Sequence, residues 1–323
     1  MPGFKRRLAR VAPRAYSPAA VSTSTTAVVP ASSRGISASD LAIVGVVIAW
    51  GTNYTVVKEA METLPPLAFM SLRFTIAALA MGALLLGVEG WKPLPRPVFL
   101  KLLGLGLVGN TVYQVCFIVG LANTSVANSG MLTAVTPVLV ATLGALFGVD
   151  RLTRPLVAAL ALGVVGMLLV LGGRGASEHG ASLLGDGLIV GASLCWAIYT
   201  VGIRTVGPEV SALRITAISM LTGAPGVVLA GVPELLRLET ENIRAGAWAG
   251  VVYSALVPLV LAYFIWGRTV QKVGSSRAGL YNTGIPVVAA LTAWAVRGER
   301  PTWTQVLGAG LVLSGVLLSR RKS

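Results

Sequence analysis

Long apolar runs separated by short polar gaps make up most of the chain after Asp40. Each run is close to the roughly 20 residues that an α-helix needs to cross the hydrocarbon core of a bilayer. Backbone groups in lipid must pair within the protein, which excludes an open sheet. The pattern therefore predicts an all-α polytopic membrane protein with ten transmembrane helices. They are expected at residues 41–58, 66–88, 98–120, 125–148, 155–172, 184–203, 210–231, 246–269, 276–296 and 302–319.

Composition supports the same class of protein. Only 12% of the residues are charged, against roughly 25% in soluble domains, and the mean hydropathy is +0.78. The chain has 38 glycines, and small residues let helices approach closely in lipid. The GxxxG spacings at Gly144–Gly148 and Gly187–Gly191 predict two such contacts. Residues 102–149 carry no charge before Asp150 and are too long for one crossing, so they must fold back near Asn123.

The net charge is +14, and most of the Lys and Arg residues that produce it lie in the two tails and in the gaps between apolar runs. Residues 1–38 are rich in Arg, Ser and Pro and predict a disordered basic tail, with an organelle transit peptide as the alternative. Placing both termini in the cytoplasm puts most Lys and Arg residues on the cytoplasmic side, as the positive-inside rule requires. We expect a multi-pass protein of the plasma or inner membrane, whose partners are the bilayer and a small-molecule substrate, with no nucleic acid.

The two halves of the chain are similar in sequence. The segment TPVLVATLGALFGVDRLTRPLVAALALGVVGM (136–167) aligns without a gap with IPVVAALTAWAVRGERPTWTQVLGAGLVLSGV (285–316), which pairs Pro137 with Pro286. Earlier, WGTNYTVVK parallels WAIYTVGIR, and LRFTIA parallels LRITA. The chain is thus expected to hold a five-helix repeat at 39–173 and another at 184–320. Because five is odd, the second copy would enter the membrane from the opposite side, as an inverted repeat.

These segments resemble the EamA-type members of the drug/metabolite transporter (DMT) superfamily over roughly residues 41–319. The resemblance is carried by WGTNYTVVK, PPLAFMSLRF, TPVLVATLGALFGVDRL and RAGLYNTGIPVVAALTAWAVRGERPTWTQVLGAGLVLSGVLL. Asp150 departs from the glutamate that the family usually shows, which keeps the charge but shortens the side chain. The resemblance implies a ten-helix carrier with cytoplasmic termini that exports an amino acid or similar metabolite. A plastid or other organelle translocator is the alternative.

Polar and aromatic side chains within the runs are the candidates for a substrate site at the membrane midplane. An amide in hydrocarbon needs partners, which a cavity with a hydrogen-bonding substrate can supply. The competing interpretation is that these groups join helices or anchor them at the membrane surface. The candidates are Trp50, Asn53, Tyr54, Tyr113, Gln114, Thr133, Trp196, Tyr199, Tyr263, Trp266, Tyr281 and Asn282, with Thr136 beside Pro137 as a further one. Pro137 and Pro286 each remove a backbone hydrogen bond, which predicts a hinge or a static kink.

Charged residues near the runs receive separate predictions. Arg73 is the clear charge well inside a run, and its long stem is expected to reach the membrane surface. Contact with a carboxylate or phosphate substrate is the alternative for Arg73, although the LRF pattern of the family that the chain resembles favours a structural role. The pairs Asp150–Arg151 and Glu299–Arg300 are expected to form local ion pairs or helix caps.

Motifs of other mechanisms are missing from the sequence. There is no GxxxxGK[ST] phosphate loop and neither HExxH nor GxSxG, and Cys116 and Cys195 have no histidine in the apolar runs to activate them. His179 has no second metal ligand nearby. We therefore expect no catalytic residue, metal or cofactor, and a secondary transporter is favoured over an intramembrane enzyme or a channel. Uniport, exchange and proton coupling all remain open, because no acid occupies the middle of a run.

Overall fold

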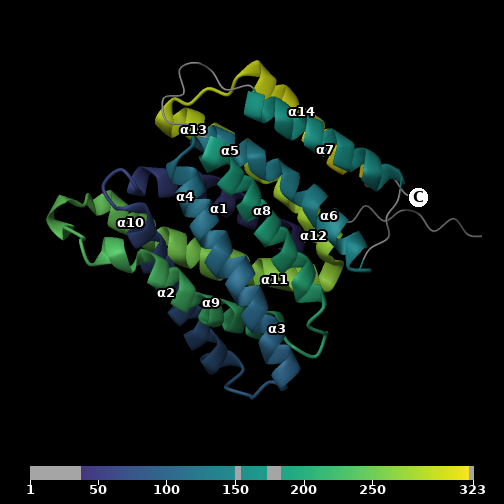
Figure 1. Ribbon diagram of the computed structural model, residues 1–323. Helices are drawn as coiled ribbons and strands as arrows, with labels where there is room; N and C mark the ends of the chain where they lie inside the picture. The colour runs from purple at the N-terminus through teal and green to yellow at the C-terminus, as the bar shows by residue number, and fades with distance from the viewer. Residues whose placement is uncertain (1–37, 150–153, 173–182, 320–323) are drawn as a thin grey trace, which may run out of the picture. The chain divides into compact units, whose positions relative to one another are not determined.

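A computed structural model describes residues 38–149, 154–172 and 183–319 (Figure 1). These residues form helices and loops, with no strand among them, so the predicted all-α class is confirmed. The predicted tail up to Ser37, the pair Asp150–Arg151 and His179 lie outside the described residues.

The first half follows the predicted ranges closely. Its elements are α1 (Ala38–Ala60), α2 (Pro66–Val88), α3 (Arg96–Gly106), the π-helical η1 (Leu107–Val112), α4 (Tyr113–Ala122), α5 (Val126–Leu132), the 3₁₀-helical η2 (Thr133–Val135), α6 (Thr136–Leu146) and α7 (Arg154–Gly172). Helices α3, η1 and α4 follow one another without a gap, as do α5, η2 and α6. The chain reverses between α4 and α5 at residues 123–125, where the uncharged stretch was expected to fold back.

The second half repeats this order of elements. It contains α8 (Leu183–Arg204), α9 (Ala212–Leu235), a short 3₁₀ turn η3 (Thr240–Asn242), α10 (Ala245–Ser254), the π-helical η4 (Ala255–Leu261), α11 (Ala262–Val273), α12 (Ser275–Gly279), the 3₁₀-helical η5 (Leu280–Gly284), α13 (Ile285–Arg297) and α14 (Trp303–Ser319). Each half thus has a π-helical segment in its third apolar run and a 3₁₀ segment in its fourth. Local departures from the α-helix that recur at matched places are often associated with function.

Helix starts follow from local chemistry. The hydroxyl of Ser125 accepts a hydrogen bond from the backbone N–H of Asn128 at 3.1 Å and caps α5, and Ser211 caps α9 in the same way through Arg214 N. Pro137 and Pro286 lie in the first turns of α6 and α13. Proline is tolerated there because the first helical N–H groups have no partner within the helix. The two prolines therefore mark a break in each run, directly after η2 and η5.

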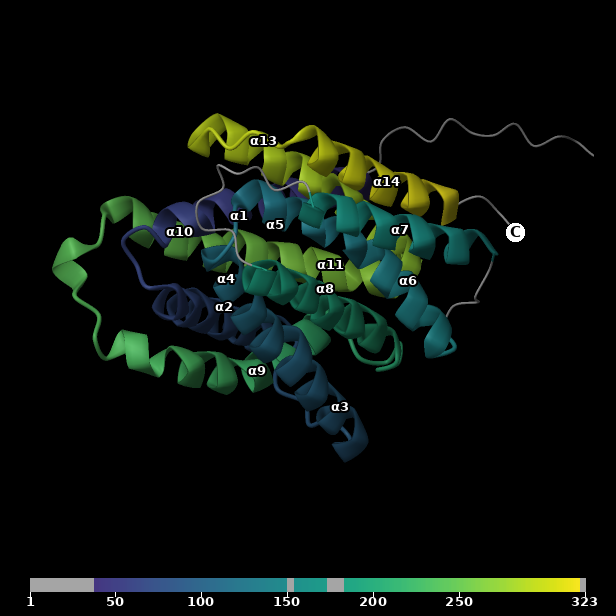
Figure 2. The ribbon, with the colours of Figure 1, turned by 45° about the horizontal axis from the view of Figure 1, so that its top comes forward.

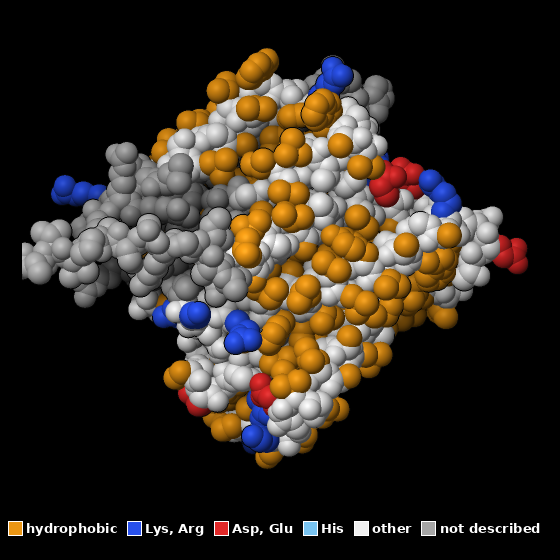
Figure 3. All heavy atoms as spheres, turned by 180° about the vertical axis from the view of Figure 1, so that it is seen from behind, with side chains coloured by type: hydrophobic (Ala, Val, Ile, Leu, Met, Phe, Trp, Pro, Cys, Tyr) orange, Lys and Arg blue, Asp and Glu red, His pale blue; other side chains and the backbone are white. Residues whose placement is uncertain are grey.

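The helices have the length and surface of membrane spans. Among the described residues, seven continuous helical segments are long and apolar enough to cross a bilayer, and α13 is a shorter apolar helix. Large apolar side chains such as Leu79, Leu86 and Leu229 point outward. Figure 3 shows apolar side chains over the broad middle of one face, with most charged ones toward its margins. A soluble protein rarely exposes so large an apolar surface. The chain is therefore a multi-pass membrane protein.

Packing joins segments that are distant in the sequence. Helices α7 and α14 lie side by side along one edge in both ribbon views (Figures 1 and 2), and α2 packs along α9. Helix α1 contacts α10, α11 and α13. The buried interior includes Phe69, Met70, Phe74 and Met81 of α2, all with no exposed surface. Each half thus contributes helices to the same core.

Close helix contacts occur at glycines outside the predicted GxxxG pairs. A Cβ atom on Gly106 of α3 would lie 2.5 Å from the carbonyl oxygen of Ser219 in α9, and one on Gly223 would lie 2.6 Å from the carbonyl oxygen of Gly106. Gly187 and Gly191 face open space, so the predicted contact there is wrong. Spacing alone does not specify which face of a helix meets a neighbour.

The contact of α3 with α9 can be tested with a matched pair of variants. We expect Gly106→Ala to destabilise the folded protein by about 1–3 kcal/mol, because the methyl group meets backbone atoms that cannot move aside. Gly104→Ala, on the same helix but facing open space, is the control. Unfolding of both variants in mixed micelles would measure the difference, and equal stability would contradict the close contact.

Candidate functional site

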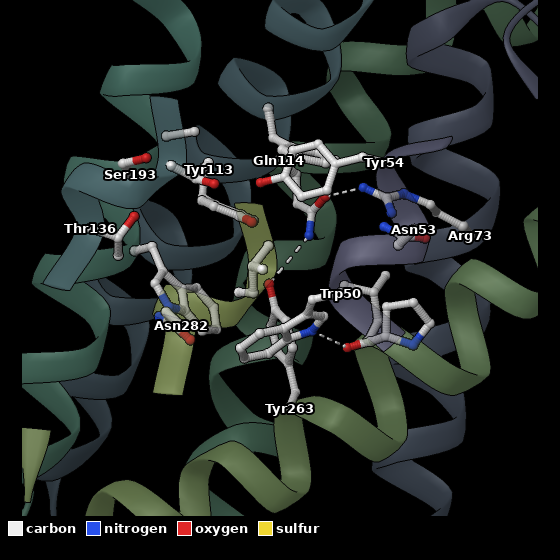
Figure 4. Close-up of a pocket in the computed structure, with 17 residues that line it drawn as sticks. Trp50, Asn53, Tyr54, Arg73, Tyr113, Gln114, Thr136, Ser193, Tyr263 and Asn282 are labelled. Carbon is white, nitrogen blue, oxygen red and sulfur yellow. Dashed lines mark hydrogen bonds between the residues drawn. The ribbon is translucent and has the colours of Figure 1, made fainter. Parts of the chain in front are cut away.

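A central pocket lies between helices of both halves (Figure 4). It has about 650 Å³ of empty space, including the part open to the surroundings. Most of the side chains predicted from sequence line it: Trp50, Asn53, Tyr54, Tyr113, Gln114, Thr133, Trp196, Tyr263 and Asn282. They come from α1, α4, η2, α8, α11 and η5, so residues spread over the chain are brought to one place.

Aromatic side chains form one wall of the pocket. The rings of Trp50 and Trp196 meet edge to face, with centroids 5.3 Å apart at 86°, and Tyr263 lies 5.1 Å from Trp196. Aromatic pairs prefer such separations and angles because of the charge distribution of their π-systems. Trp266 and Tyr199 do not line the pocket, but they pack against these rings at 5.3 Å from Trp50 and 5.4 Å from Trp196. They support the wall from behind.

Two predicted aromatics are not surface anchors. Tyr263 and Trp266 are only 4% and 2% exposed, which contradicts the interpretation that they hold α11 at the membrane surface. Tyr281 is half-buried and lies outside the pocket lining, next to Asn282, which lines it.

Hydrogen bonds hold part of the polar lining in place. The indole N–H of Trp50 donates to the carbonyl oxygen of Pro258 at 3.0 Å, within the π-helical η4. The hydroxyl of Ser254 donates to Oδ1 of Asn53 at 2.7 Å, which joins α1 to α10. Oδ1 of Asn282, by contrast, is buried in the pocket wall without a partner. The amides of Asn53 and Asn282 thus differ: one joins helices and the other has an unused acceptor.

Arg73 lies inside the pocket wall and not at the membrane surface. The residue is 1% exposed, so the expectation that its stem reaches the surface is wrong. Its Nη2 donates to Oε1 of Gln114 at 2.5 Å, and its guanidinium lies over the rings of Phe69 and Phe117 at 5.4 and 5.7 Å. Gln114 in turn donates from Nε2 to the hydroxyl of Tyr263 at 3.5 Å. A chain of polar groups thus runs from α2 through α4 to α11.

Several lining residues gave no signal in the sequence. They are Phe117, Ala192, Ser193, Pro258, Leu259 and Ile285. Small and aliphatic residues occur at similar positions on every span, so their type does not separate a pocket wall from a helix contact. Thr136, which was a candidate from the sequence, also lines the pocket.

Charged groups at the end of α1 tie several elements together. Arg297 bonds to Glu59, to Glu62 at 3.1 Å and to Glu299 at 3.0 Å, and Arg244 meets Glu62 at 2.7 Å. Hydrogen bonds from Arg244 and Arg297 lower the pKa of Glu62. The ion-pair partner of Glu299 is thus Arg297, whereas the sequence suggested Arg300. These residues link α1, α13 and the start of α10.

The same end of the bundle contains two further polar contacts. The ammonium of Lys58 donates to the carbonyl oxygens of Leu121, Ala122 and Thr124 at 2.7, 3.0 and 2.8 Å. A cation is favourable at the C-terminus of α4, where the last carbonyls have no partner within the helix. Glu299 also accepts from the backbone N–H of Ala127 at 2.9 Å. The glutamate thereby satisfies a first-turn N–H of α5, which agrees with a capping role.

One carboxylate is buried at the start of α8. Asp186 is 1% exposed and accepts from Oγ1 of Thr124 at 2.7 Å and from Nδ2 of Asn128 at 2.6 Å. Oδ1 of Asn128 accepts from Nε2 of Gln305 at 3.4 Å. This network joins α5, α8 and α14 away from the pocket. Among the residues with described positions, no three His, Cys, Asp or Glu side chains gather into a metal-binding group.

Comparisons with known proteins agree with one another. The sequence model described as the EamA-like transporter family matches residues 37–172 and again 183–321. An uncharacterized transporter of Bacillus subtilis (strain 168), YyaM, is 29% identical over 279 residues, covering 85% of this chain and 91% of that protein. A probable amino-acid metabolite efflux pump of Salmonella typhimurium is 26% identical, with 85% and 92% covered. A probable terminal-alkyne amino-acid exporter of Streptantibioticus cattleyicolor is 25% identical, with 87% and 93% covered.

A solved crystal structure shares the fold. It superimposes with a TM-score of 0.65 at 20% sequence identity, over 89% of this chain and 99% of that one. At this identity the similarity concerns the fold alone.

The bond of Trp50 to Pro258 gives a test of the aromatic wall. We expect Trp50→Phe to destabilise the protein by about 1–3 kcal/mol, because the buried Pro258 carbonyl loses its donor. Trp303→Phe, at an 82% exposed site on α14, is the matched control. Unfolding in mixed micelles would compare the two variants, and a larger loss for Trp303→Phe would be inconsistent with the bond.

Proposed function

We propose that this chain, which belongs to the EamA-like transporter family, carries an amino acid or a similarly small metabolite across the membrane. Transport would proceed by alternating access, in the direction of export. The observation that carries the proposal is the central pocket, which is walled by aromatic and amide side chains and lined from both halves. Such pockets at the interface of two repeats are where secondary transporters bind substrate. The relatives named as a probable terminal-alkyne amino-acid exporter and a probable amino-acid metabolite efflux pump support the substrate class and the direction.

An inverted repeat, with ten crossings divided at 39–173 and 184–320, is part of this proposal. The two matches of the family model support the division. So do reciprocal contacts across the bundle. A Cβ atom on Gly130 would meet Ala289, and one on Gly279 would meet Val140. The alignment that pairs Pro137 with Pro286 also pairs Val140 with Ala289, and it pairs Gly130 with Gly279 when it is continued upstream without a gap. Matched residues in swapped contacts are expected of a two-fold axis between the halves.

The same axis would pass near the pocket. Trp50 and Trp196, which are matched in the two halves, touch each other there. Thr133 and Asn282 are another matched pair, and both line the pocket. A substrate on such an axis can be reached from either side when the halves exchange conformations. The twelve residues predicted as substrate-binding stay candidates in this proposal, with Tyr199 and Trp266 behind the wall. Pro137 and Pro286 are proposed as the hinges of the fourth span in each half.

Opening toward one side would require the ionic contacts at the end of α1 to separate. Arg297, Glu59, Glu62 and Arg244 lie at the ends of elements from both halves and hold them together in this structure. We propose that this cluster is on the outer side, since the termini are proposed to lie in the cytoplasm of a plasma or inner membrane. Partly exposed ion pairs contribute little stability each, so they can separate at small cost during a transport cycle.

Transport through the pocket can be tested by filling it. Ala192 of α8 lines the pocket, whereas Leu194 of the same helix is exposed to lipid. We expect Ala192→Trp to lower counterflow of labelled amino acids in proteoliposomes by roughly 10-fold or more, since an indole leaves no room for substrate. Leu194→Trp should retain the flux of the unmodified protein.

Folding must be separated from blockage in this test. Thermal unfolding should be compared for both variants, with Ser193→Leu as a milder substitution in the same wall. Unchanged flux in a folded Ala192→Trp protein would place the substrate path elsewhere. An absence of saturable flux for every metabolite in a broad panel would contradict the proposed function itself.

The proposed topology makes a second prediction. With Cys116 and Cys195 replaced by alanine, we expect a cysteine at Glu241 to react with an impermeant maleimide from outside the cell. A cysteine at Lys92 should react only after the membrane is opened. Labelling of both positions from the same side would contradict the inverted arrangement.

A further inference from the structure

Arg73 carries a positive charge that no acidic group of the described structure offsets. Arginine stays protonated at neutral pH. Its one hydrogen-bonding partner, Gln114, is neutral, and Nε of Arg73 is buried without an acceptor. The rings of Phe69 and Phe117 attract the cation only weakly compared with what burial of a charge costs. A buried guanidinium with an unused N–H in the pocket wall is a site for an anion.

The similar segment in the second half shows what such an arginine binds when an acid is present. Arg214 follows a leucine in LRITA as Arg73 does in LRFTIA. It is also buried, but its Nε lies 3.3 Å from Oε2 of Glu89. Its other nitrogens donate to the carbonyl oxygens of Lys92 and Gly90. Arg214 therefore has a complete set of acceptors within the chain. Arg73 lacks the carboxylate, and it faces a pocket where a substrate carboxylate could take that place.

The rest of the pocket does not provide a matching site for a cation. Its lining contains no aspartate or glutamate, so a substrate ammonium would find only aromatic faces and neutral oxygens there. Oδ1 of Asn282 is the buried acceptor without a partner in that lining. It can accept a hydrogen bond from an ammonium or equally from a neutral hydroxyl. The charged side chain in the lining is the positive Arg73. The pocket therefore favours an anionic group.

We propose that Arg73 is the specificity-determining residue of the pocket and binds the carboxylate of the substrate, while the ammonium of an amino acid is not required. This rests on the proposed function, which places the substrate in this pocket. The apolar body of the substrate would lie against Trp50 and Trp196. Carboxylates that lack the amino group should then bind, and amines that lack the carboxylate should not.

A matched set of probes tests this distinction. Phenylalanine, 3-phenylpropionate and phenethylamine share one aromatic body and differ in the charged groups. A second pair, 4-methylpentanoate and isoamylamine, repeats the comparison with an aliphatic body. Binding to purified protein in detergent can be followed by the fluorescence of the pocket tryptophans. We expect the carboxylates to bind at least about 10-fold more tightly than the matching amines, as for one charge-assisted hydrogen bond.

Two substitutions assign the effect to Arg73. Arg73→Gln should weaken binding of 3-phenylpropionate by about 10- to 100-fold. Gln114→Glu, which is nearly isosteric, should do the same by supplying Arg73 with an internal carboxylate like that of Glu89. It also covers the case in which Arg73→Gln fails to fold. Arg73→Lys, which keeps the charge without the planar fork, should restore part of the affinity lost in Arg73→Gln. Arg237→Gln, on an exposed loop, is the control and should bind normally.

The outcomes separate this inference from the transport proposal. Equal or tighter binding of the amines, no binding of either carboxylate, or normal binding by folded Arg73→Gln and Gln114→Glu proteins would each overturn the role of Arg73. Selective carboxylate binding without flux in proteoliposomes would support the role of Arg73 and contradict transport. Flux of amines that is insensitive to Gln114→Glu would support transport and overturn the inference.

Discussion

In hydrocarbon, a polar group has no water to bind, so each backbone and side-chain group must find a partner within the protein. Many contacts in this structure follow from that constraint. The hydroxyls of Thr52, Thr142 and Thr269 donate to the carbonyl oxygen four residues earlier in their own helices. Lys58 satisfies three carbonyls where α4 ends. Trp50 donates to a carbonyl of the π-helical segment η4, where the regular pattern of the α-helix is interrupted.

Because of the same constraint, a buried polar group that has no partner within the protein is a candidate for binding a ligand. Where two helices meet, a polar side chain such as Thr111 of η1 donates to the partner backbone, here the carbonyl oxygen of Gly223 at 2.7 Å. In the pocket, Nε of Arg73 and Oδ1 of Asn282 have no such partner. A substrate that enters the pocket can supply what these two groups lack. Irregular helix segments border the same space: η2 and η5 each contribute to the lining.

How far the site could be predicted depended on residue type. Trp50, Asn53 and Gln114 stand out in an apolar run, and their inward position could be inferred because lipid does not satisfy amides or indole N–H groups. Ala192 and Leu259 carry no such signal, because lipid, a helix neighbour and a pocket suit them equally. Tyr199 and Trp266 show a further difficulty: the sequence pointed correctly to the aromatic cluster but could not distinguish its inner surface from its supporting layer.

The apolar runs by themselves determined that this chain forms helices in a membrane, and its internal similarity paired Pro137 with Pro286. Both properties depend only on the order of residues along the chain. Only the tertiary structure decided where Arg73 points and which glycines touch, since a helical pattern defines faces but not the neighbours that cover them. An arginine expected at the membrane surface is buried beside Gln114. The functional consequence of its charge depends on the neighbouring side chains, which the sequence does not specify.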